Sequence, residues 1–239
     1  MSSNLEPCEP DHASQLLLNP LEVPMSDEVR QEARQIAFCE GEFLVKVLES
    51  EGELRRAYHL RHRVFAEKLK WVPERNDQLE SDGYDTCSTS IGLFSARGQH
   101  LGIGRITRAP FPFMLESEFS ACLVGSHRLR KESDPAEITR LAVDPSITDR
   151  GLSARLMRTV HQRPLSVVPR PRRSLYLHGC GTSSASCPPM MGWPCRPIGR
   201  TIALPPAQAL SIGALIDLDE VRDRQLSTSY KGPDGLFQL

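Results

Sequence analysis

The chain has 239 residues, which suits one domain with a substantial core and leaves little room for a second. Its 29 Lys and Arg residues nearly balance 30 Asp and Glu residues, so the formal net charge of -1 favours neither nucleic acid nor an anionic membrane as a partner. Seven cysteines at irregular spacings predict neither a disulfide framework nor a zinc site, and we expect reduced thiols and no metal.

The N-terminal region, residues 1–40, is polar and interrupted by prolines, and we interpret it as an extension outside the core. Residues 27–38 are its one helical candidate. The first residues are acidic rather than basic, unlike a signal peptide, and no apolar run reaches the roughly 18 residues that a membrane span needs. These features predict a soluble cytoplasmic protein with no membrane partner.

The next elements follow from periodicity. Residues 42–50 are apolar enough to predict a strand, and residues 52–69 place apolar side chains at helical spacing. Residues 70–89 mix acids, Pro and Gly without periodicity, which predicts a long loop, and long loops in compact domains are often functional. The β-rich segments 90–97 and 100–108 flank a Gly-containing turn and predict a hairpin.

A Pro-broken loop leading into a short helix is expected at 109–124. Alternation at 136–146 predicts another strand, and residues 149–162 again have helical spacing. The order of these elements predicts an α+β layered fold with a mostly antiparallel central sheet.

Residues 161–189 do not continue this pattern, because prolines, arginines, serines and glycines alternate there without apolar periodicity. We predict no regular element in the segment, although the fold requires a buried strand there, and therefore a disrupted C-terminal part. One hypothesis is a pair of compensating frameshifts, and the alternative is a natural flexible insertion. Strand-like apolar runs return after residue 190.

The predicted helix at 52–69 carries the first group of candidate functional residues. Arg61 and Phe65 lie four residues apart and therefore share one helix face, and Trp71 follows near the end of the helix. This face offers a cation beside aromatic surface. Viewed singly, Phe65 and Trp71 are as well explained as core aromatics.

The long loop places three carboxylates close together. Glu80, Asp82 and Asp85 fall within six residues, an arrangement that costs free energy through mutual repulsion unless cations lie nearby. Arg61 and Arg105 are the candidate cations. The alternative, without a functional role, is that these residues form a solvated charged surface that contributes little to stability.

These residues form a series that resembles the sequence signature of the acyl-homoserine-lactone (autoinducer) synthases in residue type and order. The resemblance covers about residues 43–160, with fainter similarity after Met190. The matching positions are Arg61, Val64, Phe65, Trp71, Glu80, Asp82, Asp85, Arg105, Phe119, Glu137 and Arg140.

The resemblance implies one GNAT-like acyltransferase domain over residues 41–239, a three-layer sandwich with a mostly antiparallel sheet. It implies transfer of an acyl group from acyl carrier protein to the amine of S-adenosylmethionine, after which lactone closure releases methylthioadenosine. The product is a quorum-sensing signal. Acyl-CoA is the alternative donor, no cofactor is expected beyond the two substrates, and oligomeric state stays open.

The resemblance also implies residue roles. Glu137, held by an arginine, is the candidate base for the attacking amine. Backbone N–H groups near 103–106 and 141–144 are candidates to hold the thioester oxygen. The residues implied to bind S-adenosylmethionine are Arg61, Phe65, Trp71, Glu80 and Phe119. The residues implied to form the catalytic ion-pair network are Asp82, Asp85, Arg105, Glu137 and Arg140.

Two other interpretations remain open from the sequence. One is an acyltransferase of the exosortase-associated type, thought to make N-acyl amino acids, which the chain resembles in its long N-terminal extension and its EITRLAV strand. The other is an inactive remnant of the fold, because Pro and Arg replace the apolar strand expected within 161–189.

Overall fold

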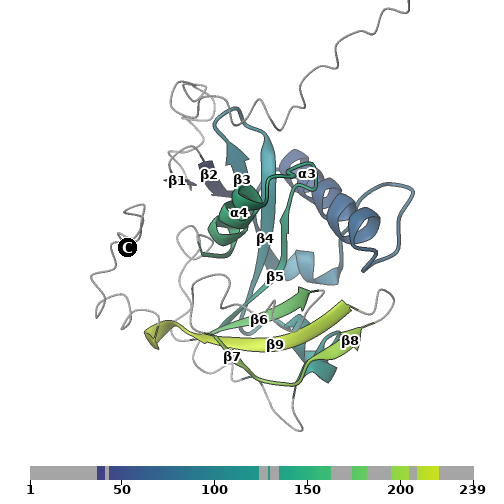
Figure 1. Ribbon diagram of the computed structural model, residues 1–239, viewed down its shortest axis with the longest axis vertical. Helices are drawn as coiled ribbons and strands as arrows, with labels where there is room; N and C mark the ends of the chain where they lie inside the picture. The colour runs from purple at the N-terminus through teal and green to yellow at the C-terminus, as the bar shows by residue number, and fades with distance from the viewer. Residues whose placement is uncertain are drawn as a thin grey trace, which may run out of the picture.

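The computed structural model describes residues 37–40, 43–123, 129, 135–162, 174–181, 195–204 and 209–220 (Figure 1). The N-terminal region up to residue 36 lies outside this part of the chain, and with it most of the helical candidate at 27–38. Ala37 and Phe38, at the end of that candidate, belong instead to a strand. The sheet therefore begins before residue 41, the predicted start of the domain.

The described residues form one nine-stranded sheet. Its first five strands pair in chain order and are all antiparallel. The sixth strand lies parallel to the fifth, and the ninth pairs antiparallel with the sixth, seventh and eighth. The strands are β1 (Ala37–Glu40), β2 (Phe43–Val47), β3 (Ser88–Ser95), β4 (His100–Arg108), β5 (Ala136–Val143), β6 (Ser174–Gly181), β7 (Arg196–Pro197), β8 (Ile202–Leu204) and β9 (Ala209–Asp217).

Helices cover both faces of this sheet, as α4 in front of the strands in Figure 1 illustrates. Alternation along β2 makes the division clear, because successive strand residues point to opposite faces. Leu44 packs in a cluster with α3 (Glu51–Arg61), whereas Val45 packs in another with α4 (Arg150–Gln162). The predicted three-layer α+β architecture with a mostly antiparallel sheet is confirmed.

The helix predicted at 52–69 is present but changes its winding. Ser50 and Glu53 form a capping box at the start of α3, which satisfies backbone N–H groups that a helix end would leave unpaired. After Arg61 the chain continues as a π-helix, His62–Lys68, which ends with Leu69 N donating to Val64 O. This wider turn lies next to the candidate functional residues, where π-helical turns are frequent.

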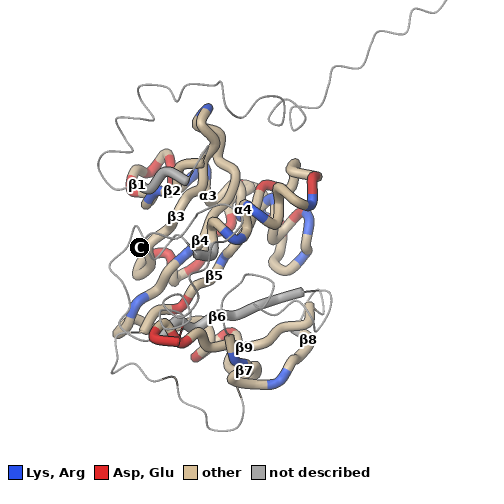
Figure 2. Tube along the Cα trace, turned by 60° about the vertical axis from the view of Figure 1, so that its left-hand side comes forward, with Lys and Arg blue, Asp and Glu red and all other residues tan. Residues whose placement is uncertain are grey.

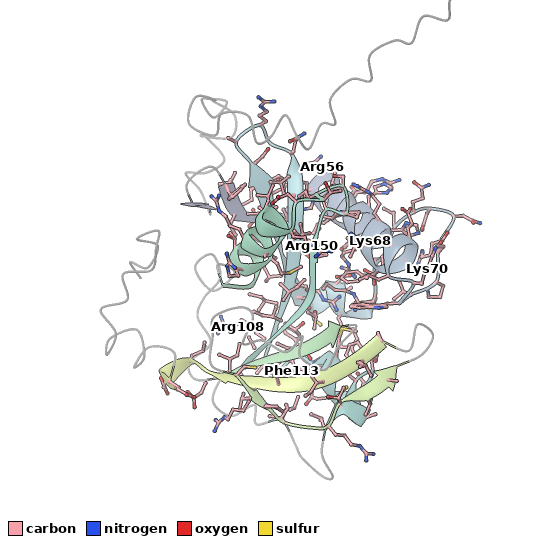
Figure 3. The ribbon with its side chains drawn as sticks, viewed as in Figure 1. Arg56, Lys68, Lys70, Arg108, Phe113 and Arg150 are labelled. Carbon is pink, nitrogen blue, oxygen red and sulfur yellow. The ribbon has the colours of Figure 1, made fainter. Side chains whose placement is uncertain are left out.

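Three short 3-10 helices complete the described elements. They are Gly83–Cys87, inside the predicted long loop, and Met114–Glu116 and Ser120–Cys122, in the region where a short helix is expected. The second and third lie beside a cluster of buried side chains that includes Phe113, which Figure 3 labels at the level of β9. These turns bring the chain from the end of β4 back under the sheet.

The prediction that residues 161–189 hold no regular element is wrong for the stretch 174–181. There β6 pairs with β5 on one side and β9 on the other, with Leu177 opposite both Ile138 and Ala214. The prolines of this region lie before and after the strand and leave eight consecutive residues free to join the ladder. Residues 163–173 and 182–194 lie outside the described part, and the frameshift hypothesis stays a prediction.

Charged residues of both signs are interspersed along the described part of the chain, and Figure 2 shows neither a large blue area nor a large red one. Within the same residues, no helix combines the length and apolar character needed to cross a membrane.

Candidate functional site

Three arginines from three different elements meet three carboxylates from the loop after the π-helix. The arginines come from the end of α3, from β4 and from β5, and they share the carboxylates among themselves. Three formal positive charges therefore face three negative ones. The members of this group, which we call the ion network, are Arg61, Arg105, Arg140, Glu80, Asp82 and Asp85.

Glu80 links the helix to the sheet. Its carboxylate accepts hydrogen bonds from Arg61 Nε and, at 3.1 Å, from Arg140 Nε. Its backbone N–H donates to Tyr58 O at 3.1 Å, which fixes the loop against α3. Glu80 is almost completely buried, so each of its oxygens depends on an arginine to offset the loss of hydration.

Asp82 and Asp85 bind Arg105 together. Arg105 Nη1 lies 2.5 Å from Asp82 Oδ1 and 2.9 Å from Asp85 Oδ1, and the Arg105 side chain is 0% exposed. The two acids also cap the 3-10 helix at Gly83–Cys87, because Tyr84 N donates to Asp82 and Asp82 N donates to Asp85. The prediction that Arg61 and Arg105 answer the loop carboxylates is confirmed by these contacts.

Burial and charge act against each other in this network. Burial alone would raise the pKa of the Asp85 carboxyl, but the Arg61 guanidinium lowers that pKa below its ordinary value. Burial likewise opposes the charge of Arg61, yet Glu80 and Asp85 raise its pKa. For Arg140 burial is the larger effect and lowers the pKa. Removal of one member would leave an opposite charge buried without a counter-charge, which is destabilising. The stability of each charge therefore depends on the others.

One donor in the network has no hydrogen-bond partner. Arg61 Nη2 is buried and makes no hydrogen bond to the described residues; Asp82 Oδ2 lies 3.7 Å from it. A buried N–H group without a partner costs free energy and is uncommon in folded proteins.

Arg140 reaches the network through a bulge in the sheet. The register between β4 and β5 shifts, so that Ile103 pairs with Ala142 whereas Arg105 pairs with Thr139. Arg140 lies in the irregular stretch with a φ of 53°, a left-handed conformation that is uncommon for a residue with a side chain. The bulge leaves Gly104 without a partner in the β4–β5 ladder, although Gly104 still pairs with Ile91 of β3. Gly104 lies within one of the two stretches predicted to hold the thioester oxygen.

Glu137 lies on the same strand but has different partners. Its side chain is 0% exposed, and its two oxygens accept hydrogen bonds from Met114 N at 2.7 Å and Leu115 N at 2.9 Å. The expectation that an arginine holds Glu137 is therefore corrected, because two backbone amides do so. Burial raises the pKa of this carboxyl to about 7, although those two hydrogen bonds act in the opposite direction.

Two aromatic rings border the ion network. Phe65 and Trp71 stack with their centroids 5.9 Å apart, and the Arg140 guanidinium lies 5.6 Å from the Phe65 ring centroid. Phe119 does not lie beside the ion network. It packs against the separate cluster around Phe113.

Sequence reasoning missed two further rings. Tyr58 lies under Arg61 with the guanidinium 5.3 Å from its ring centroid, and Tyr84 lies 5.6 Å from the Arg105 guanidinium. The spacing of Tyr58, three residues before Arg61 on one helix, was an available signal. Among the described residues no group of three or more His, Cys, Asp or Glu is arranged to hold a metal ion.

The layered fold and the ion network together define a GNAT-like protein with a buried, charge-balanced site. A family model described as autoinducer synthase matches residues 46–165, which is half of the chain. The chain therefore belongs to the autoinducer synthase family.

Curated relatives match over a shorter stretch. The acyl-homoserine-lactone synthase of Aeromonas salmonicida is 38% identical over 96 residues, 40% of this chain and 44% of the relative. The match thus spans less than half of the relative's own length.

Solved structures agree in fold over a larger share of the chain. The structure of TofI in a ternary complex with an inhibitor and MTA has a TM-score of 0.59 at 18% identity, covering 74% of this chain and 91% of TofI. The structure of BjaI, a CoA-dependent acyl-homoserine lactone synthase, with SAM and isopentyl-CoA has a TM-score of 0.55 at 22% identity, covering 72% and 81%.

Proposed function

We propose that this protein makes acyl-homoserine lactones from S-adenosylmethionine and an acyl thioester. The amine of S-adenosylmethionine attacks the thioester carbonyl and expels the thiol. The carboxylate of the same molecule then displaces methylthioadenosine and closes the lactone. The observation that carries the proposal is the ion network of three arginines and three carboxylates beside the stacked pair of Phe65 and Trp71.

The two sides of this site suit the two charged ends of S-adenosylmethionine. A sulfonium cation is attracted to aromatic faces, which Phe65 and Trp71 supply. Arg140 is the most exposed arginine of the network, at 14%, and its positive charge suits the substrate carboxylate. Asp82 is the most exposed carboxylate of the network, at 21%, and is therefore the carboxylate proposed to contact the substrate.

Glu137 is the proposed proton acceptor. An amine must be neutral to attack, and a base is most effective when its pKa lies near the working pH. The raised pKa of Glu137, about 7, meets that condition. Two acceptor positions on its oxygens stay free beyond the bonds from Met114 and Leu115, because a carboxylate has about four. Because the carboxylate is buried, the proton would reach it through a water molecule.

The acyl donor is proposed to be acyl carrier protein, as the family resemblance implies, with acyl-CoA as the other donor to be tested. The bulge between β4 and β5 is proposed to turn backbone N–H groups toward the thioester oxygen. This would stabilise the charge that develops there during attack.

An assay of the purified protein tests this proposal. The chain is incubated with labelled S-adenosylmethionine and either acyl carrier protein thioester or acyl-CoA, and the products are separated by chromatography and identified by mass spectrometry. We expect acyl-homoserine lactone and methylthioadenosine in equal amounts. In a parallel reaction with free amino acids in place of S-adenosylmethionine, acyl amino acid would support the N-acyl amino acid synthase instead, and no product in either reaction with either donor would support the inactive remnant.

A variant of the aromatic pair tests the binding role. We expect Trp71→Ala to raise the KM for S-adenosylmethionine about tenfold while kcat changes little, because loss of a cation–π contact costs on the order of 1–2 kcal/mol. Methylthioadenosine release at several substrate concentrations measures both constants. An unchanged KM would remove Trp71 from the substrate site.

A further inference from the structure

His62 follows Arg61 in the chain but does not belong to the ion network. Its side chain is only 3% exposed, and both of its ring nitrogens have partners. Arg75 N lies 3.2 Å from His62 Nε2, and Glu67 Oε1 lies 3.1 Å from His62 Nδ1. A buried histidine with both nitrogens engaged has a defined orientation and a defined protonation pattern.

The partners determine which nitrogen carries the proton. A backbone N–H can only donate, so His62 Nε2 must accept the hydrogen bond from Arg75. The ring is therefore neutral with its proton on Nδ1, and it donates that proton to the Glu67 carboxylate. A second proton on the ring would sit on Nε2 and face the Arg75 N–H.

The Arg75 contact lies in the middle of a loop, residues 70–79, that is fixed near both ends. At its start Trp71 N donates to Phe65 O at 2.8 Å, and just past its end Glu80 N donates to Tyr58 O at 3.1 Å. Residues 73–78 between these points are exposed, and Figure 3 shows Lys70 at the outer side of the loop. His62 ties this exposed stretch to the buried face of the π-helix.

We propose that His62 is a positioning residue: its neutral, Nδ1-protonated ring holds the 70–79 loop so that Trp71 and Glu80, at its two ends, are placed to receive S-adenosylmethionine. This inference rests on the proposed function for the identity of the ligand. The tether itself follows from the contacts of His62 alone. Without it, binding would have to order the middle of the loop, and that cost would appear as weaker binding.

Two substitutions separate the hydrogen bond from the volume of the ring. His62→Gln keeps an acceptor that can reach the position of Nε2, whereas His62→Leu fills similar space without one. We expect His62→Leu to raise the KM for S-adenosylmethionine about tenfold with kcat within about twofold, since the loop loses its hydrogen bond to the π-helix and substrate binding must then order it. His62→Gln is expected to restore most of the affinity. His59→Leu, on α3 and three residues earlier, is the matched control and should leave KM unchanged.

Two measurements test the tether whether or not the protein has synthase activity. Nitrogen-15 NMR of the histidine ring should show the Nδ1–H tautomer for His62. Hydrogen exchange should show a protected Arg75 amide that loses protection in His62→Leu but keeps it in His62→Gln.

The inference is overturned by a proton on Nε2, by an Arg75 amide that exchanges equally fast in all variants, or by a KM in His62→Leu equal to that of the wild type. Equal damage in both His62 variants would also overturn it, because volume rather than the hydrogen bond would then matter. If no variant releases methylthioadenosine but the NMR and exchange results hold, the proposed function fails and the tether stands.

Discussion

At the scale of a single residue, the environment of Glu137 acts on the pKa of its carboxyl in two opposite directions. Complete burial favours the protonated form, whereas hydrogen bonds from Met114 and Leu115 favour the ionised one. Burial is the larger effect. The same two bonds anchor the turn that places Met114 Sδ 3.0 Å from Arg105 Nη2, so Glu137 also supports the wall of the ion network.

The raised pKa of Glu137 predicts a specific pH dependence of stability. The carboxyl has a pKa of about 7 in the folded protein against its ordinary value of 4.5, so between these two pH values the folded state binds a proton that the unfolded state has lost. The stabilisation that the protonated Glu137 carboxyl contributes is fully present below pH 4.5 and is lost as the pH rises through about 7. Relative to Glu137→Gln, the wild type should lose about 3 kcal/mol of unfolding free energy over that window.

Denaturant unfolding of both proteins at about pH 5 and about pH 8 measures this difference. The variant should also lose synthase turnover, because the amide of Gln cannot accept the proton. Parallel pH curves for the two proteins would show that Glu137 titrates normally.

At the scale of elements, the contact between α4 and β4 depends on two glycines. An added Cβ at Gly102 would lie 2.9 Å from Val160 Cγ2 and 3.0 Å from the Ala142 carbonyl oxygen, and one at Gly104 would lie 3.2 Å from Val160 Cγ1. The helix thus lies directly on the backbone of the strand that carries Arg105. Close packing at this point sets where the middle of β4 lies.

Gly102→Ala should therefore destabilise the protein by about 1–3 kcal/mol, because the new methyl group overlaps a stiff valine and a backbone carbonyl. Gly83→Ala is the matched control: its Cβ would meet nothing within 4 Å, and we expect a change below about 0.5 kcal/mol. Thermal or denaturant unfolding compares the two. Equal effects would mean that α4 does not pack as closely as described.

At the scale of the whole molecule, β6 joins the two halves of the sheet. It lies between β5, which carries Glu137 and Arg140, and β9, which pairs with β7 and β8. The inactive-remnant interpretation assumed that this strand is missing. Its presence removes the main reason for that interpretation, since Ala214 and Ile216 of β9 belong to the same core cluster as apolar residues of β2 to β5.

Hydrogen exchange tests the strand directly. Residues 175–177 pair with β5 on one side and β9 on the other, and residues 178–180 pair with β9. We expect the hydrogen-bonded amides of residues 175–177 to exchange at least about a hundredfold more slowly than in an unfolded chain. The interior of β5 in the same protein is the internal reference. Exchange at the rate of an unfolded chain would restore the prediction of a disrupted segment.

The sequence by itself determined the order of elements through β5 and α4, because helical and alternating periods are local properties that the residues display directly. It also named all six members of the ion network as candidate site residues, since their types and order match the family series. It assigned two of them, Arg61 and Glu80, to substrate binding, and it placed Glu137 in the network, where the structure does not have it.

Only the tertiary structure shows which residues contact one another at the site. The left-handed Arg140 depends on a bulge in strand pairing, Glu137 takes its backbone partners from a turn more than twenty residues away, and Phe119 packs in another cluster. The sequence did not predict β6, because this short strand lies between two segments that contain prolines. Register, bulges and pairing are fixed by contacts between distant segments, and no local pattern records them.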